Sequence, residues 1–137
     1  MRIAVTGSSG LIGSALCASL EGDGHEVVRV VRSASGSGTV RWDIDAGTID
    51  ASGLEGLDGV VHLAGEGIAS GRFTDAHKRK VLESRTRGTA LLSRTLAELD
   101  APPPVLLSGS AIGYYGDRGD EELTEASPPG EGFLPEV

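Results

Sequence analysis

Three glycines near the amino terminus have the spacing of a phosphate-binding turn. They lie in the segment Gly7-Ser8-Ser9-Gly10-Leu11-Ile12-Gly13. In such a turn the first glycine permits the tight bend, the second lets the backbone approach a pyrophosphate, and the third lets a helix pack closely on a strand. Backbone N–H groups at the start of the helix then face the negative charge. If a strand precedes it and a helix follows, the segment predicts dinucleotide binding by Gly7, Ser8, Ser9, Gly10, Leu11, Ile12 and Gly13; the alternative is an ordinary glycine-rich turn.

The residues at the end of the next apolar strand bear on which dinucleotide binds. An acidic residue there binds the adenosine ribose hydroxyls and repels a 2′-phosphate. This stretch instead offers Arg29, Arg32 and Ser33, and Glu26 stands at the opposite end of the strand. Because a guanidinium pairs well with a phosphate, Arg32 favours NADP over NAD as the cofactor. The alternative is that Arg32 is a solvated cation at a strand end.

Two further segments end predicted strands and are candidates for the same cofactor. Asp43 follows a short third strand, where its carboxylate either accepts a hydrogen bond from the adenine amino group or lies in a surface turn. Leu63, Ala64 and Gly65 end the fourth strand, where small residues let the backbone approach the ribose and nicotinamide. His62 lies inside that apolar run, and we interpret it as a packed strand residue rather than a proton-transfer group.

The elements that must position these residues alternate between strand and helix. The apolar spacing from Leu11 to Leu20 predicts one face of a helix, and that from Thr74 to Leu99 predicts a longer helix with Thr74 as its N-cap. Short apolar runs predict buried strands at residues 3–5, 26–32, 39–42, 59–65 and 105–107. This alternation predicts an α/β fold, a Rossmann-type doubly wound parallel sheet with strand order 3-2-1-4-5.

The composition changes after Tyr115. The acidic residues beyond it are Asp117, Asp120, Glu121, Glu122, Glu125, Glu131 and Glu136, against the single cation Arg118. We expect residues 1–115 to form an NAD(P)-binding domain and residues 116–137 an acidic, Gly- and Pro-rich loop. Such a loop would lead toward a missing substrate region, so the chain is interpreted as truncated or as a fragment.

Composition also disfavours several classes of partner. The formal net charge is −8 and no basic stripe is present, which argues against a nucleic-acid partner. Cys17 is the only cysteine, so neither an internal disulfide nor a cysteine-clustered metal site is expected. No apolar run approaches the roughly 18 residues of a membrane span, and no signal peptide is evident. We therefore expect a cytoplasmic protein that binds a small-molecule substrate.

Four segments together resemble one protein family. They are residues 6–13, 62–68, 84–89 and 108–116. With them the chain resembles, over essentially its whole length, the amino-terminal portion of the atypical extended short-chain dehydrogenase/reductases, the NAD-dependent epimerase/dehydratase (nucleoside-diphosphate-sugar epimerase-like) family. Members of that family are longer and continue into the rest of a substrate region and a small carboxy-terminal domain.

The resemblance assigns a role to Ser110 but leaves the proton-transfer group open. Short-chain dehydrogenases use a serine that binds the reacting oxygen and a Tyr-x-x-x-Lys pair that moves the proton. Ser110 matches the serine. No Tyr-x-x-x-Lys occurs in this chain, and the family's tyrosine position looks like Leu134. Tyr114 and Tyr115 are the two tyrosines; Tyr114 is the candidate acid, although we favour a role for both in lining the pocket.

The same resemblance suggests a role for Arg85 and a general activity. Arg85 matches the position of an asparagine that many relatives place beside the nicotinamide, where an arginine would bind a phosphate or a substrate anion; the alternative is a surface arginine. The implied function is that of an NAD(P)-dependent epimerase, dehydratase or reductase acting on a small hydroxylated or nucleotide-linked substrate. A catalytically weak redox sensor or scaffold protein is the alternative. Extended relatives often dimerise through a helix such as that over residues 74–99.

Overall fold

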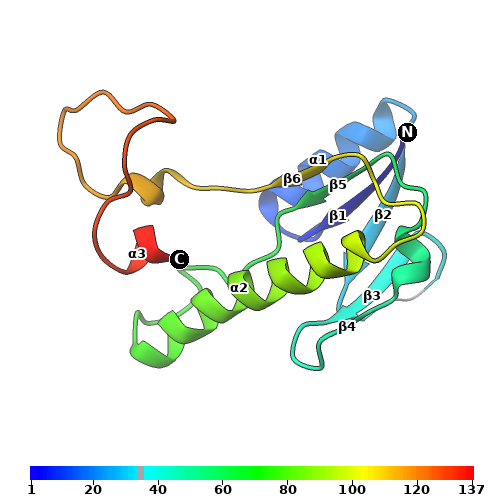
Figure 1. Ribbon diagram of the computed structural model, residues 1–137, viewed down its shortest axis with the longest axis horizontal. Coiled ribbons are helices and arrows are strands. Elements are labelled where there is room, and N and C mark those ends of the chain that lie inside the picture. The colour runs from blue at the N-terminus through cyan, green and yellow to red at the C-terminus, as the bar shows by residue number, and fades with distance from the viewer. Residues whose placement is uncertain (34–35) are drawn as a thin grey trace.

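The computed structural model describes residues 1–33 and 36–137 (Figure 1). Its strands are β1 (Arg2–Thr6), β2 (Glu26–Val31), β3 (Thr39–Asp43), β4 (Thr48–Ile49), β5 (Gly59–His62) and β6 (Leu106–Ser108). Its helices are α1 (Leu11–Gly22), α2 (Asp75–Ala97) and α3 (Phe133–Glu136), with 3₁₀ turns η1 (Ala51–Leu54) and η2 (Ile112–Tyr115). The strand that precedes the glycine segment and the helix that follows it are thus both present.

The strands form one sheet in the order β4-β3-β2-β1-β5-β6. All neighbours are parallel except β4, which pairs antiparallel with β3. The predicted order 3-2-1-4-5 is therefore confirmed for the five parallel strands. The sequence prediction missed β4 because a two-residue strand is too short to show a periodic pattern.

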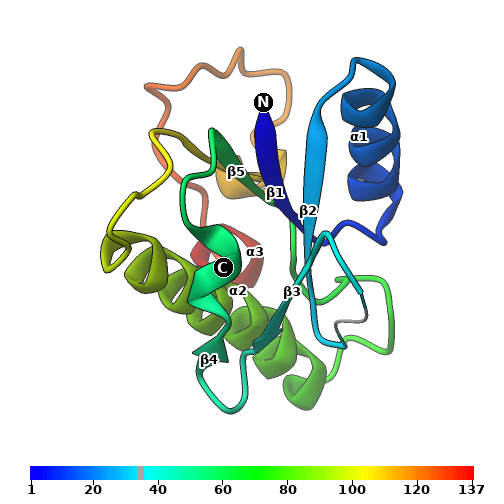
Figure 2. The same ribbon diagram turned by 90° about the vertical axis from the view of Figure 1, so that its right-hand side faces the viewer.

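The two long helices cover opposite faces of this sheet (Figure 2). Successive strand residues point to opposite faces. Ile3 and Val5 of β1 accordingly pack with Cys17 of α1, whereas Ala4 packs in a separate cluster with Leu92 of α2. The fold is the predicted doubly wound Rossmann arrangement, with a core on each face of β1.

Helix α1 is rotated relative to its predicted face. Leu11 and Ile12 were expected on the buried side, but their exposed fractions are 91% and 68%, and the buried residues of the helix are Gly13 and Cys17. The phase is set by Gly13, because only a residue without a side chain fits against the backbone of Gly7. The spacing of apolar residues in the sequence gives no information about this backbone contact.

Helix α2 begins and packs as predicted. The Thr74 side chain accepts a hydrogen bond from the backbone N–H of His77 (3.3 Å), so Thr74 is the N-cap. The expected inward residues Val81, Gly88, Leu92, Leu96 and Leu99 are all buried, together with Leu91. The longest predicted helix is thus confirmed, and it ends at Ala97.

The prediction of a buried strand at residues 105–107 is wrong. Leu106 and Leu107 of β6 are 39% and 60% exposed, because β6 pairs only with β5 and lies at the edge of the sheet. From there the chain runs away from the sheet (Figure 1). It includes the short helix α3, which the expected loop over residues 116–137 did not contain. Of the helices described, none is long and apolar enough to cross a membrane.

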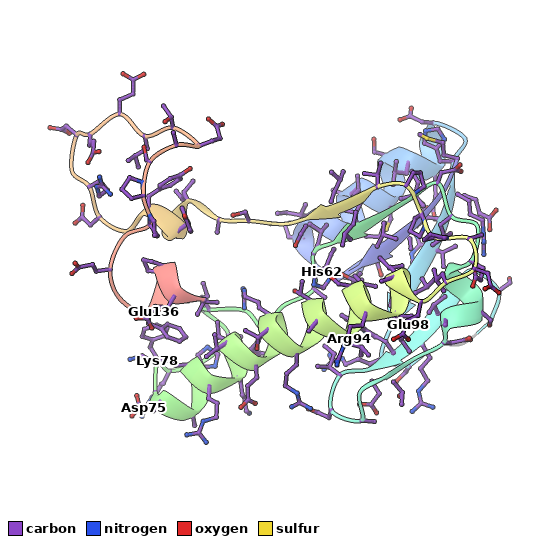
Figure 3. All side chains as sticks on the ribbon, viewed as in Figure 1. His62, Asp75, Lys78, Arg94, Glu98 and Glu136 are labelled. Carbon is purple, nitrogen blue, oxygen red and sulfur yellow. The ribbon has the colours of Figure 1, made fainter. Side chains whose placement is uncertain are left out.

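The carboxy-terminal segment returns to contact the start of α2. The rings of Phe73 and Phe133 meet edge to face, with centroids 5.6 Å apart, and the ammonium group of Lys78 lies 5.0 Å and 5.8 Å from their centroids. Lys78 and α3 accordingly lie side by side at the far end of α2 from the sheet (Figure 3).

Candidate functional site

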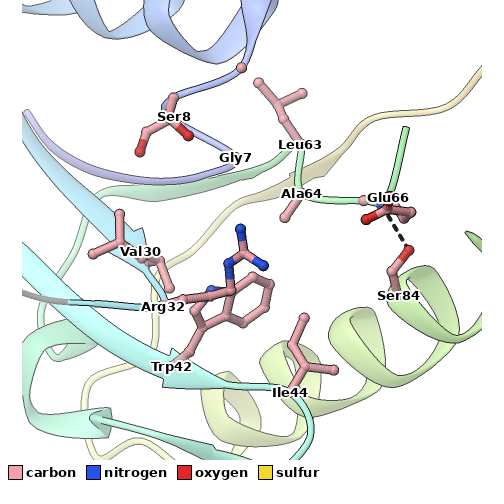
Figure 4. A pocket seen from close by; sticks show the side chains of 14 residues that line it. Gly7, Ser8, Val30, Arg32, Trp42, Ile44, Leu63, Ala64, Glu66 and Ser84 are labelled. Atoms are coloured by element: carbon pink, nitrogen blue, oxygen red, sulfur yellow. Dashed lines mark hydrogen bonds between the residues drawn. The ribbon is translucent and has the colours of Figure 1, made fainter. Parts of the chain in front are cut away.

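A cleft of about 340 Å³ opens at the carboxyl ends of the parallel strands. Crevices at this edge are where doubly wound sheets bind ligands. Its lining includes the predicted site residues Gly7, Ser8, Ser9, Gly10, Arg32, Leu63, Ala64 and Gly65. The structure thus brings together three segments that the sequence had nominated separately (Figure 4). The remaining lining residues, which sequence reasoning missed as site residues, are Val30, Val31, Trp42, Ile44, Glu66 and Ser84.

Gly7 and Gly13 cannot carry side chains in this turn. Gly7 has a φ of +67°, and a Cβ there would stand 2.8 Å from the carbonyl carbon of Leu63. A Cβ on Gly13 would overlap the backbone of Gly7. Gly10 closes the turn, because its N–H donates to the carbonyl oxygen of Gly7 (3.0 Å). The turn therefore lies tightly between β5 and the start of α1.

The first turn of α1 presents free hydrogen-bond donors. Within the described residues, no acceptor lies within bonding distance of the backbone N–H groups of Leu11, Ile12 and Gly13, as expected at a helix amino terminus. The partial positive charge of the helix dipole lies at the same end. Side-chain-free glycines, free N–H groups and the dipole fit the pyrophosphate of a dinucleotide.

Arg32 is the cationic side chain among the described residues that line the cleft. Figure 4 shows its guanidinium directed into that space. Arg29, which lies within β2, instead pairs with Glu21 of α1 (2.7 Å), and Glu26 pairs with Arg2 at the far end of β2 (3.1 Å). The end of β2 thus brings a positive charge to the cleft and no carboxylate.

Asp43 takes part in a turn outside the cleft lining. Its Oδ1 accepts hydrogen bonds from the backbone N–H groups of Asp45 (3.0 Å) and Ala46 (2.9 Å). Its neighbours Trp42 and Ile44 line the cleft instead. The sequence could have indicated both residues, because they are apolar and lie on either side of Asp43 at the end of the predicted third strand. A hydrogen bond donated by the adenine amino group to Asp43 stays a prediction.

Arg85 supports the cleft from outside its lining. Its Nη1 donates to the carbonyl oxygens of Glu66 (3.0 Å) and Val81 (3.1 Å). The backbone N–H of Glu66 donates in turn to Oγ of Ser84 (2.8 Å; Figure 4). Two adjacent residues of α2 therefore hold the segment after β5, so the position of Arg85 is that of a support for the cleft wall.

Ser110 and Tyr114 lie outside the cleft lining. Both are exposed, Tyr114 by 43%, and neither lines the cleft. The ring of Tyr114 packs edge to face on Tyr115, with centroids 5.1 Å apart. The reason is the path of the chain, which leaves the sheet after β6 rather than folding over the edge that holds the glycine turn.

His62 is a packed strand residue, as predicted. It is 3% exposed, and its ring contacts the hydroxyl groups of Thr6 and Thr89 and the edge of Trp42. Burial lowers the pKa of this imidazole below its ordinary value.

The chain matches known proteins over nearly its whole length. It is 40% identical over 136 residues to an epimerase family protein of Mycobacterium bovis, covering 98% of this chain and 44% of that protein. A nucleoside-diphosphate sugar epimerase from Corynebacterium glutamicum has a similar structure, with a TM-score of 0.83, 43% identity, and coverage of 99% of this chain and 28% of the other. The human epimerase family protein SDR39U1 (isoform 2) with NADPH gives a TM-score of 0.86 at 35% identity, covering 99% and 45%.

These relatives are longer than the chain, which spans less than half of each. The family described as NAD dependent epimerase/dehydratase matches residues 3–133. That range contains the glycine turn, the cleft and most of the carboxy-terminal segment. Together with the NAD(P)-binding Rossmann fold, it shows that this chain belongs to the NAD dependent epimerase/dehydratase family.

Proposed function

We propose that the chain is the dinucleotide-binding part of an NADP-dependent oxidoreductase or epimerase that acts on a small hydroxylated or nucleotide-linked substrate. The observation that carries the choice of NADP is Arg32, which brings a positive charge to the β2 end of the cleft where NAD-binding relatives of the fold place a carboxylate. The NADPH in the human relative supports the same choice. The name of the Corynebacterium glutamicum relative supports a nucleotide-linked substrate.

Each part of the cleft would bind one part of the cofactor. The free N–H groups that follow Gly10 would hold the pyrophosphate, and Arg32 would pair with the 2′-phosphate. Trp42 and Ile44 would lie beside the adenine, and the segment Leu63-Ala64-Gly65 would face the nicotinamide half. When bound, the nicotinamide supplies hydride transfer.

The substrate-side residues need a different path of the chain after β6. Ser110 would bind the reacting oxygen, and Tyr114 would line the pocket or act as an acid. Neither residue lines the cleft in this structure, so these roles require the segment after β6 to approach a bound substrate more closely. We therefore expect this 137-residue chain to bind cofactor and to turn over little substrate.

The test compares NADPH and NADH affinities in matched charge variants. Trp42 is the only tryptophan and lines the cleft, so its fluorescence reports binding. We expect the wild type to prefer NADPH by about tenfold or more, and Arg32→Asp to lose that preference. Arg41→Asp makes the same charge change on an exposed residue of β3 outside the cleft lining, and should keep it. An equal preference in the wild type and Arg32→Asp refutes the assignment.

A second candidate function is that of a redox sensor or scaffold that binds the dinucleotide without efficient catalysis. Leu134 at the family's tyrosine position, and the exposed positions of Ser110 and Tyr114, favour it. NADPH oxidation across panels of carbonyl compounds and sugar nucleotides separates the two. Turnover by the longest natural form of the chain supports the enzyme, whereas tight binding without turnover supports the sensor.

A further inference from the structure

The hydroxyl group of Thr6 lies at the centre of a buried hydrogen-bond network. Thr6 ends β1 and is fully buried. Its Oγ1 lies 3.1 Å from the backbone nitrogens of both Leu63 and Ala64, and 2.7 Å from Nδ1 of His62. A hydroxyl has two lone pairs and one proton. Because the two backbone N–H groups fill both lone pairs, the proton of Thr6 must be donated to Nδ1.

This arrangement determines the state of the His62 ring. Since Nδ1 accepts a hydrogen bond, the ring proton is on Nε2, where it faces Oγ1 of Thr89 at 3.0 Å. His62 lies between the sheet and α2 (Figure 3). A continuous chain of hydrogen bonds thus runs from α2, through a neutral imidazole and Thr6, to the backbone of Leu63 and Ala64.

That chain ends on the wall of the cleft. Leu63 and Ala64 line the cleft, and Gly7 follows Thr6 directly. The backbones of Gly7 and Leu63 lie so close that a Cβ on Gly7 would stand 2.8 Å from the Leu63 carbonyl. Thr6 therefore joins the glycine turn to the adjoining segment Leu63-Ala64, so that a change at its hydroxyl would move one relative to the other.

We propose that His62 is a positioning residue for the cofactor. As its neutral Nε2–H tautomer, it orients the Thr6 hydroxyl so that Leu63 and Ala64 stay bonded beside the glycine turn. The proposal rests on the proposed function of the cleft as a dinucleotide site, and extends it to a residue that contacts no ligand.

The network makes cofactor binding sensitive to acid. A protonated ring has an N–H at Nδ1 as well, and Thr6 has no lone pair left to accept it. Protonation therefore displaces Leu63 or Ala64 from Thr6 or leaves a buried donor unpaired. Since burial lowers the pKa of His62, the neutral form persists at neutral pH and the effect begins below the ordinary range of histidine.

Other charged groups near the ring are already engaged. On α2, Arg85 lies one turn before Thr89 and donates to backbone carbonyl oxygens, one of them that of Glu66. On β3, Asp43 stands beside Trp42 and accepts from two turn N–H groups. β5 and β6 hold no other titratable side chain, and Arg2 of β1 lies at the opposite end of its strand, paired with Glu26.

The test is the pH profile of NADPH affinity in two matched variants. His62→Asn offers an amide oxygen near the position of Nδ1 and does not titrate. His62→Gln reaches toward Thr89 but offers no acceptor to Thr6. Between about pH 8 and pH 5, protonation of the 2′-phosphate weakens NADPH binding to both proteins alike, and we expect wild-type affinity to fall by about threefold or more beyond the fall seen in His62→Asn. His62→Gln should bind about tenfold more weakly throughout.

A second measurement needs no variant and no cofactor. Long-range ¹⁵N–¹H correlation spectra show which ring nitrogen of His62 carries the proton, and amide exchange gives the protection of Leu63 and Ala64. We expect an Nε2–H ring, with protection factors that fall together as the ring is protonated. The positioning role alone is overturned by an Nδ1–H ring, or by a loss of NADPH affinity at low pH that is as large in His62→Asn as in the wild type. A wild-type chain that binds neither NADPH nor NADH overturns the proposed function with it.

Discussion

The guanidinium of Arg85 lies directly against Gly65. Its Cζ is 3.1 Å from the point at which a Cβ on Gly65 would stand, and its Nη1 donates to the next residue's carbonyl oxygen. The segment after β5 is therefore held by Arg85 at Gly65 and Glu66, and by Thr6 at Ala64. The lack of a side chain at Gly65 is what allows the arginine to lie there.

Replacing Gly65 with alanine should disturb this contact without opposing the backbone conformation. The new methyl group forces the Arg85 guanidinium to move, which weakens its bond to Glu66. We expect NADPH to bind about threefold to tenfold more weakly, measured by the fluorescence of Trp42. Gly67→Ala is the control, because its Cβ would meet Ser70 at an ordinary 3.4 Å. Equal affinities in the two variants would count against a supporting role for Arg85.

Two glycines of α1 should respond in opposite directions to alanine. Gly13→Ala overlaps the backbone of Gly7, so the free energy of unfolding should fall by about 1–3 kcal/mol. Gly22→Ala meets no atom within 4 Å and improves helix propensity, so stability should rise by about 0.5 kcal/mol. Urea unfolding followed by circular dichroism measures both. An unchanged free energy of unfolding in Gly13→Ala would show that the glycine turn relaxes easily to accommodate the methyl group.

The stability of the chain should depend on the titration of His62. Burial lowers its pKa in the folded chain, whereas the unfolded chain titrates near the ordinary value of about 6.5. Between these two values the unfolded state binds more protons, so stability rises with pH. The contribution is fully present above pH 6.5 and is lost as the pH falls through the folded pKa.

Urea unfolding midpoints measured across this pH range test whether stability rises with pH. The midpoint of the wild type should decline below about pH 6.5 more steeply than that of His62→Asn, which lacks the titrating ring. Since the other ionisable groups are common to both proteins, the difference between the curves isolates His62. Parallel curves would mean that the ring is protonated equally in both states.

Cys17 should be unreactive in the folded chain. Cys17 is 2% exposed, and burial is the main cause that raises the pKa of its thiol. Because the thiolate is the reactive form, both effects slow its reaction with an aromatic disulfide reagent. We expect no reaction in native buffer and one thiol per chain in denaturant. Rapid stoichiometric reaction before unfolding would show that α1 separates from the sheet.

The fold could be predicted where local pattern and packing agree. The strand order follows from the alternation of strands and helices, and the inward face of α2 follows from apolar periodicity. The N-cap Thr74 follows from capping chemistry. The glycine turn and Leu63-Ala64-Gly65 could be nominated because the carboxyl ends of parallel strands meet at one edge. In each of these cases the pattern of residues along the sequence and the tertiary packing favour the same structure.

Other features depend on contacts that no local pattern contains. Leu11 is exposed because Gly13, which has no side chain, is the residue of α1 that lies against the backbone of Gly7. Leu107 is exposed because β6 lies at the edge of the sheet. Glu66 and Ser84 line the cleft because a hydrogen bond between them joins the segment after β5 to α2. Ser110 is exposed outside the cleft lining because of the path taken after β6. Each of these is decided by long-range geometry.

The central place of β1 in the sheet bears on how the chain is made. β1 leaves the ribosome before both of the strands that it pairs with, β2 and β5. Thr6 and its partner His62 are separated by 56 positions. During vectorial synthesis one edge of this apolar strand therefore stays unpaired until β5 emerges, and an unpaired apolar edge is the kind of surface through which incomplete chains associate.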